Sequence, residues 1–388
     1  MDNRKPILRI GLLLTGGYNW VGGLYYVINI IKVLKSSADY KSIKLIIFFS
    51  KNTPKDIVEE VKELGVELAN IDRFGFVKKV CYKFFRLITK RNLQLEHIIN
   101  PYKLNVLYPL SQYFHDLGGL NCKIVYWIYD FQHKFLPHLF EQNEIAQRDR
   151  NFAEMAKYAE YLVVSSEDAA RHFHQFYPTS KSKLFVLRFV SMIDKAKLTN
   201  IKKMHKIYKV TIPYFIVANQ FWIHKNHIVV LKAINMLKQK KLKFKVIITG
   251  KQHDHRNPDY FKQLSEYISQ NKISDYIDFT GFISREDQLG LIQNSLAVIQ
   301  PSKFEGWSTV VEDAKALDKY LLLSNLAVHL EQVQINGSFF DSDDFETLAI
   351  YMEKVLNNQF GYIQENYSNN INQFSELLMT TFLSIRSE

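Results

Sequence analysis

The chain has few cysteines and no long apolar run. Cys81 and Cys122 are its only cysteines, which is too few for a disulfide framework or a cysteine-based metal site. No apolar stretch approaches the roughly eighteen residues of a membrane-spanning helix, and no internal repeat or low-complexity tract is evident. These absences exclude the disulfide-rich and transmembrane classes and favour a cytoplasmic globular protein.

The charge balance of the chain is basic. Lysine and arginine number 50 against 39 acidic residues, for a net charge of +11. A surplus of this size indicates anionic partners, whether nucleic acid, phosphorylated substrates or a lipid surface. The hydrophobic content of 47% is ordinary for globular proteins, and 388 residues are enough for two domains.

Apolar runs of strand length alternate with segments of helical periodicity through both halves of the chain. This alternation is typical of right-handed βαβ units and predicts an α/β fold with two doubly wound, Rossmann-like domains. We expect a first domain over residues 1–195, a second over 211–365, and a terminal helix over 366–388 that crosses back to the first domain. The lysine-rich, poorly periodic residues 196–210 are expected to form the linker.

One stretch in the second half combines the features of a ligand site. The apolar run 296–299 predicts a buried strand, and a loop containing Gly306 follows it. Thr309 and Glu312 have the spacing of a capping box, so we expect a helix from about Val310 whose N-terminus suits a phosphate. Acidic residues beside this N-terminus suit a ligand that also carries hydroxyls, such as a nucleotide sugar. The alternative is an ordinary strand, turn and capped helix.

Residues 304–317 resemble the signature of the family 4 retaining glycosyltransferases, in which two acids stand eight positions apart. Here these acids are Glu305 and Asp313, so the second is an aspartate in place of the usual glutamate. The resemblance implies that Glu305 binds hydroxyls of the donor sugar and Asp313 those of the ribose, which leaves Glu312 for the cap. It also implies that the backbone of the turn holds the diphosphate, through Gly306, Trp307, Ser308 and Thr309.

The same resemblance implies the GT-B fold, with two Rossmann-like domains facing each other across a cleft. The implied reaction transfers a sugar from a nucleotide-diphosphate donor to an acceptor hydroxyl with retention of the anomeric configuration. No cofactor and no metal ion are expected, because a helix dipole and a lysine supply the positive charge. The expected acceptor is a saccharide or a lipid-linked saccharide, in the synthesis of bacterial surface polysaccharide or glycolipid.

A glycine-rich loop follows the first expected strand, residues 7–14, and precedes a helix expected from Leu24. Such a loop lets the backbone approach a ligand closely, although its spacing matches neither the dinucleotide fingerprint nor a Walker loop. A bare turn is the alternative. The family resemblance places this loop over the donor diphosphate and the acceptor, through Gly16, Gly17, Gly22 and Gly23.

The strand expected over residues 123–127 leads into a run that contains Asp130, Gln132 and His133. Polar residues beyond the carboxyl end of a parallel strand lie where open α/β sheets bind their ligands. A lone histidine is ordinarily structural. This run, however, resembles a segment of the same transferases in which the histidine approaches the donor sugar, so we count His133 with Glu305 among the expected catalytic residues.

Lys225 lies in an expected strand-to-helix loop, where its ammonium group can meet a diphosphate as a point charge. The resemblance implies this contact and makes Lys225 the third expected catalytic residue. The family also has an arginine five positions earlier, where this chain has Gln220. Glutamine can donate a hydrogen bond to a phosphate but cannot neutralise its charge.

Residues 73–91 contain basic and aromatic residues but no acidic ones. A basic amphipathic helix suits an anionic membrane surface, which would make the protein peripheral on the cytoplasmic face of the membrane. An ordinary helix covering the sheet is the alternative. Nucleic acid is the least favoured partner, because no recognition motif accompanies the charge.

We expect residues 253–258 to form a solvated loop, because their histidine and aspartate spacing matches no metal motif. Residues 325–338 are also expected to be a loop. Because of Gln220, a catalytically silent homologue or partner subunit is an alternative function, and a nucleic-acid-binding α/β protein is a less favoured one.

Overall fold

The structure is a computed structural model that describes residues 7–17, 21–73, 82, 88–210 and 213–387. Most of the basic segment 73–91 lies outside the described residues. The chain divides into two compact units: unit 1 comprises Met1–Tyr129, Ala146–Met192 and Ser368–Glu388, and unit 2 comprises Asp130–Ile145 and Ile193–Tyr367. No helix in the described ranges is both long and apolar enough to cross a membrane.

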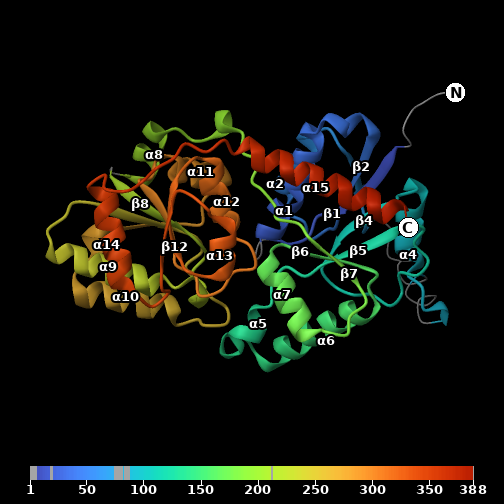
Figure 1. Ribbon diagram of the computed structural model, residues 1–388, viewed down its shortest axis with the longest axis horizontal. Helices are drawn as coiled ribbons and strands as arrows, with labels where there is room; N and C mark the ends of the chain where they lie inside the picture. The colour runs from blue at the N-terminus through green and yellow to red at the C-terminus, as the bar shows by residue number, and fades with distance from the viewer. Residues whose placement is uncertain (1–6, 18–20, 74–81, 83–87, 211–212, 388) are drawn as a thin grey trace. The chain divides into compact units, whose positions relative to one another are not determined.

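Unit 1 is built on a seven-stranded parallel sheet with strand order β3-β2-β1-β4-β5-β6-β7 (Figure 1). Its strands are β1 (Leu8–Leu13), β2 (Ile43–Phe49), β3 (Glu67–Asn70), β4 (Val106–Leu110), β5 (Lys123–Trp127), β6 (Tyr161–Val164) and β7 (Lys183–Val186). Its described helices are α1 (Val21–Ser36), α2 (Lys55–Glu63), α4 (Leu93–Ile99), most of α6 (Gln142–Tyr158), α7 (Glu167–Phe176) and α15 (Ser368–Ser387). The last helix is part of this core, because the buried Phe382 packs edge-on against Tyr108 of β4.

Unit 2 has a six-stranded parallel sheet with strand order β10-β9-β8-β11-β12-β13. Its strands are β8 (Tyr214–Ala218), β9 (Lys245–Thr249), β10 (Ile277–Gly281), β11 (Ala297–Gln300), β12 (Tyr320–Ser324) and β13 (Gly337–Phe340). Its described α-helices are α5 (Gln132–Phe135), α8 (Ile201–Tyr208), α9 (His227–Gln239), α10 (Tyr260–Asn271), α11 (Arg285–Asn294), α12 (Thr309–Ala316), α13 (Ala327–Gln332) and α14 (Phe345–Leu356).

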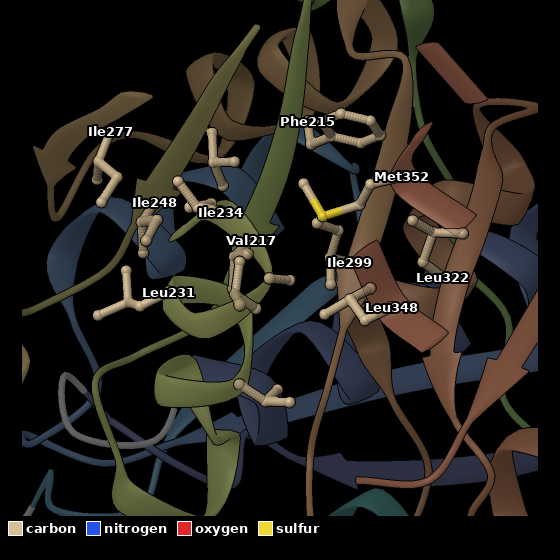
Figure 2. Packing of buried hydrophobic residues seen from close by; sticks show 14 of the residues in the cluster. Phe215, Val217, Leu231, Ile234, Ile248, Ile277, Ile299, Leu322, Leu348 and Met352 are labelled. Atoms are coloured by element: carbon tan, nitrogen blue, oxygen red, sulfur yellow. The ribbon is translucent and has the colours of Figure 1, made fainter. Parts of the chain in front are cut away.

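The core of unit 2 shows why its strands are apolar on both faces. Successive side chains of a strand point to opposite faces, so Phe215 and Val217 of β8 pack with α9, α10 and α14 in one cluster (Figure 2). Ile216 of the same strand packs with α8, α11 and α12 in the other. A parallel sheet covered by helices on both sides therefore needs the near-continuous apolar runs that predicted it.

Two segments differ from the sequence-based expectation. The linker expected at 196–210 contains α8, which begins at the capping residue Asn200 and buries Met204 in the core of unit 2. Because exposed lysines surround the few apolar residues of α8, the sequence shows no clear helical periodicity there. The loop expected at 325–338 contains α13 and the first two residues of the edge strand β13.

The strand order of each sheet reverses once. In unit 2 the chain moves outward from β8 through β9 to β10 and then returns to place β11 on the other side of β8. The loops that follow β8 and β11 therefore diverge from neighbouring strands at one edge of the sheet. Ligands of open α/β sheets bind at this kind of switch point, outside the carboxyl ends of the strands.

Candidate functional site

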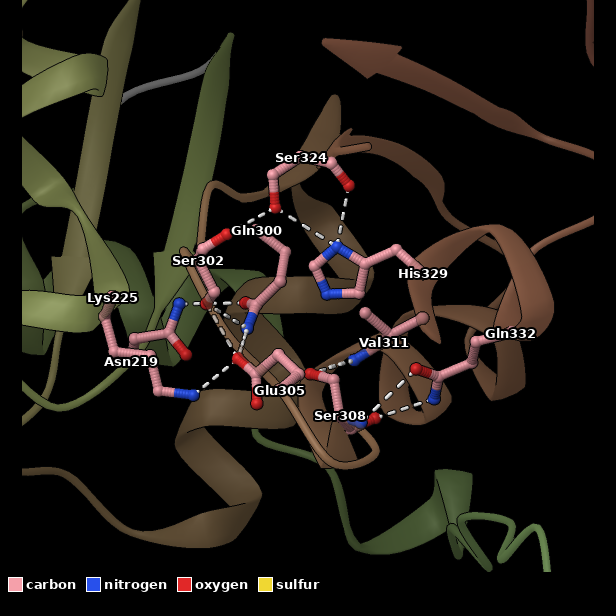
Figure 3. A network of polar contacts seen from close by, with 10 residues as sticks. All are labelled: Asn219, Lys225, Gln300, Ser302, Glu305, Ser308, Val311, Ser324, His329 and Gln332. Atoms are coloured by element: carbon pink, nitrogen blue, oxygen red, sulfur yellow. Dashed lines mark hydrogen bonds and ion pairs between the residues drawn. The ribbon is translucent and has the colours of Figure 1, made fainter. Parts of the chain in front are cut away.

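The loops after β8 and β11 bring Lys225 and Glu305 into contact. Lys225 ends a short 3-10 turn (Ile223–Lys225), and Glu305 lies between β11 and α12. Their Nζ and Oε1 atoms are 2.6 Å apart, and both side chains are largely buried (Figure 3). Two residues predicted to act on one ligand, eighty positions apart in the sequence, thus form a buried ion pair.

The two carboxylate oxygens of Glu305 differ in their surroundings. Oε1 also accepts hydrogen bonds from Gln300 Nε2 at 2.8 Å and from Ser302 Oγ at 2.7 Å. Asn219 in turn donates to Gln300 Oε1 at 2.8 Å and fixes the orientation of that amide. Oε2 has no partner among the described residues and is not sealed from solvent. The network therefore holds one oxygen and leaves the other open.

The charge state of Glu305 follows from the same contacts. Burial alone would raise the pKa of this carboxyl group. The attraction of Lys225, with hydrogen bonds from Lys225 and Ser302, outweighs burial and lowers the pKa below its usual value. Glu305 is therefore a carboxylate at neutral pH.

His329, on α13, is a site residue that the sequence analysis missed. Its Nδ1 lies 2.9 Å from the carbonyl oxygen of Ser324, so Nδ1 carries the hydrogen and Nε2 is an acceptor. Nε2 is buried and has no partner among the described residues. Burial lowers the pKa of His329, which keeps the ring neutral. The histidine lies in a segment expected to be a loop, so no periodicity pointed to it.

The start of α12 is fixed by Ser308 and not by Thr309, the expected cap. Ser308 Oγ accepts from the Val311 amide at 3.4 Å, and Thr309 is the first helical residue. Gln332 of α13 donates to the Ser308 carbonyl at 2.9 Å and so secures the turn. The amides of Thr309 and Val310 have no acceptor among the described residues, and they point out of the helix N-terminus, where an anion is stabilised.

Glu312 does not complete a capping box, which corrects that expectation. Its carboxylate is buried and accepts from Gln332 Nε2 at 2.8 Å, while Lys315 lies 3.3 Å away and the Tyr367 hydroxyl donates to its other oxygen. Glu312 therefore ties α12 to α13 and to the end of unit 2. Asp313 is completely buried, and Arg285 of α11 holds both of its oxygens.

The loop after β9 adjoins the turn that carries Lys225. Gln220 Oε1 accepts from the Lys251 amide at 2.8 Å. Asp254, expected in a solvated loop, is 4% exposed and accepts from the Ile223 amide at 3.0 Å. It thereby ties this loop to the Lys225 turn. Among the described residues, no cluster of three histidine, cysteine or acidic side chains is placed to hold a metal ion.

The glycines of the first loop fall into two groups. Gly16, with a φ of 120°, and Gly17 lie in the turn after β1. Gly22 and Gly23 belong to the first turn of α1, which begins at Val21 and not at Leu24 as expected. A side chain added at Gly17 would contact none of the described residues within 4 Å, so this turn is open on their side.

The segment containing His133 belongs by its contacts to unit 2, although it was expected in the first domain. Asp130 Oδ1 accepts from the Gln132 amide at 3.0 Å at the start of α5. His133 is buried, with its ring 6.3 Å from that of Phe140. Phe140 in turn packs under Arg256, whose guanidinium carbon lies 4.1 Å from the ring centroid.

The fold and this site together define the class of the protein: it has the two-domain GT-B fold of glycosyltransferases. A glycosyltransferase from Rickettsia africae matches with a TM-score of 0.66 and 17% identity, over 98% of each chain. HepE from Anabaena, in complex with UDP and glucose, matches with a TM-score of 0.66 and 14% identity, over 97% of this chain and 100% of that chain. At these identities the likeness establishes the fold alone.

The second half of the chain matches a family model. Residues 200–374 match the model of glycosyl transferases group 1. The matched residues include Lys225, Glu305 and the start of α12. Comparison with curated proteins finds no match.

Proposed function

We propose that the protein transfers a sugar from a nucleoside diphosphate donor to an acceptor hydroxyl with retention at the anomeric carbon. The observation that carries this proposal is the Glu305 site, where one oxygen is locked by Lys225 and the other is open to a ligand. The group 1 domain supports it. The Anabaena relative was also solved with UDP-glucose, which supports a nucleotide-sugar donor.

The proposed chemistry assigns one task to each group. An ammonium group has three hydrogens, so Lys225 can keep its bond to Glu305 and still donate to the diphosphate. The amides of Thr309 and Val310 would face the same phosphates, and together they would stabilise charge on the leaving group. Glu305 Oε2 would accept a hydroxyl of the donor sugar. In a front-face reaction the leaving phosphate takes the acceptor proton, so no nucleophilic side chain is required.

Several expected roles remain part of this proposal. His133 approaches the donor sugar, and the open turn at Gly16 and Gly17 faces the donor and the acceptor. No metal ion or further cofactor is needed, because Lys225 and the start of α12 supply positive charge. The acceptor is a saccharide or lipid-linked saccharide of bacterial surface synthesis, and the protein works in the cytoplasm or on the cytoplasmic face of the membrane.

The test begins with a thermal-shift panel of UDP, GDP, ADP and CMP and their sugar derivatives, because a bound ligand stabilises the folded state. The stabilising donor is then assayed for slow hydrolysis and for transfer to saccharide acceptors. We expect Glu305→Ala to lower turnover by at least about a hundredfold. A chain that no nucleotide stabilises would contradict the proposal.

A silent homologue is the second candidate, because Gln220 stands where the family has an arginine. It predicts that a donor binds while neither hydrolysis nor transfer occurs. Slow turnover that Glu305→Ala abolishes would exclude this candidate.

Membrane docking through residues 73–91 is a separate part of the proposal. Flotation with anionic vesicles tests it: binding should be lost when Lys78, Lys79, Lys83 and Arg86 are changed to glutamate. Unchanged binding would contradict it.

A further inference from the structure

Asp313 does not present a free carboxylate to a ligand. Arg285, the first residue of α11, donates from Nη1 to Asp313 Oδ2 at 2.5 Å and from Nη2 to Oδ1. Asp313 is 0% exposed, whereas 15% of the Arg285 side chain reaches solvent. Of the two charged groups, the guanidinium is therefore the one that faces outward.

Arg285 lies beside the carboxyl ends of β8 and β9. Its Nη1 is 3.5 Å from Oε1 of Gln288, one turn further along α11. The amide of Gln288 lies 3.4 Å from the Ala218 carbonyl and 3.3 Å from Thr249 Oγ1, which are the last residues of these two strands. One side chain thus separates Arg285 from the sheet edge at which ligands of such folds bind.

At the same edge of the sheet, this chain has a glutamine, Gln220, where the family has an arginine. Gln220 follows Ala218 by two residues, and its side chain is held by the Lys251 amide, two residues after Thr249. A guanidinium group has five N–H donors, so one arginine can bind a carboxylate and a phosphate oxygen at the same time. Arginine also matches the oxygens of a phosphate better than any other side chain.

We propose that Arg285 binds a phosphate group of the nucleotide and supplies the positive charge that Gln220 does not. Asp313 is then a positioning residue, because its buried carboxylate fixes the guanidinium in place. This inference rests on the proposed function. It replaces the ribose contact that the family resemblance implied for Asp313, because Asp313 acts through Arg285.

The test compares a nucleoside diphosphate with its nucleoside. UDP, GDP and ADP are first screened against the wild type, and the best of them and its nucleoside are titrated calorimetrically. We expect Arg285→Gln to lower the affinity for the diphosphate by about 10-fold to 100-fold, which is the loss typical of a charge-assisted hydrogen bond. The affinity for the nucleoside should stay unchanged. An equal loss for both ligands, or no loss, overturns the proposal.

Two further variants keep the test independent of folding. Arg285→Gln leaves Asp313 buried without its cation, so the double variant with Asp313→Asn removes both charges and should show the same selective loss. Asp313→Asn alone should lose diphosphate affinity and keep nucleoside affinity. If Asp313 bound the ribose, nucleoside affinity would fall instead, which overturns the positioning role.

The control is Lys245→Gln. Lys245 is the first residue of β9, at the opposite edge of the sheet, and pairs with Asp278 at 3.0 Å. The substitution removes one paired positive charge from the same unit. We expect the affinity for the diphosphate to stay within about twofold of the wild-type value. A wild type that binds no nucleotide contradicts the proposed function itself, whereas a wild type and an Arg285→Gln variant that bind equally contradict only this inference.

Discussion

The turn after β1 in unit 1 and the turn after β11 in unit 2 both join a buried parallel strand to a helix, but they place different groups there. The first offers Gly16 and Gly17, and its described residues 14–17 carry no charge. The second places the carboxylate of Glu305 against Lys225 and is fastened by Ser308. The turn after β1 supplies space and the turn after β11 supplies charge. Substitutions in the two turns should therefore impair the protein for different physical reasons.

The largest effect is expected for Lys225→Met. Removing one partner of a buried ion pair leaves the other charge uncompensated, so we expect the free energy of unfolding of unit 2 to fall by about 3–5 kcal/mol. Urea titration monitored by fluorescence measures this change. Lys303→Met is the matched control, because Lys303 pairs with Asp343 at 2.7 Å on the surface and should cost less than about 1 kcal/mol. Equal losses in the two variants would refute the buried pair.

The next effect is a pH dependence of stability. Burial, with Lys225 nearby, lowers the pKa of His227 to about 3, whereas an unfolded histidine titrates near about 6.5. Between these values the unfolded chain binds a proton that the native state does not. Stability should therefore fall with decreasing pH by about 1.4 kcal/mol per unit. His227→Phe, which keeps the stack on Phe221, should reduce this slope, and an unchanged slope would contradict the assignment.

A smaller effect separates two glycines. A side chain at Gly250 would lie 2.2 Å from the Asn219 carbonyl, at a φ of 113°. Gly250→Ala should therefore destabilise unit 2 by about 1–3 kcal/mol. In unit 1, the methyl group of Gly17→Ala would meet no atom of the described residues within 4 Å, so the change should alter stability by no more than about 0.5 kcal/mol. Thermal unfolding of both variants measures this difference in stability. Comparable losses of stability in the two variants would contradict the prediction.

The smallest effect concerns two serine caps, one in each unit. Ser166 caps α7 and Ser308 caps α12, and both are buried. Replacing either by alanine should cost about 1 kcal/mol of stability. Only Ser308→Ala should also weaken the binding of a nucleoside diphosphate, measured by calorimetry. Equal affinities in the two variants would argue against α12 as the phosphate site.

The sequence predicted best the elements that are apolar throughout. The bounds of β5 agree residue for residue with the strand expected over 123–127, because a run of buried apolar residues contrasts sharply with the polar residues on either side of it. The GT-B fold was predicted from this alternation together with the family resemblance. The pairing of Lys225 with Glu305 was not foreseen, although both residues were chosen for the same site.

The sequence could not locate contacts made by polar residues of short elements. The helix α13 has only six residues, yet it supplies His329 and Gln332 to the site. The cap of α12 was placed one residue late. Ser308 and Thr309 are both good caps, and only the hydrogen bonds of Ser308 with the Val311 amide and with Gln332 distinguish them. The partner of Asp313 lies on a different helix, 28 positions away, which no local pattern reveals.

The position of α15 has a consequence for the order in which the protein folds during synthesis. Unit 1 buries Phe374, Leu378, Phe382 and Ile385 of this helix. The ribosome makes these residues only after all of unit 2, so the first unit to begin cannot be the first to finish. A nascent chain that ends before Ser368 should hold unit 2 complete while the sheet of unit 1 still lacks one of its covering helices.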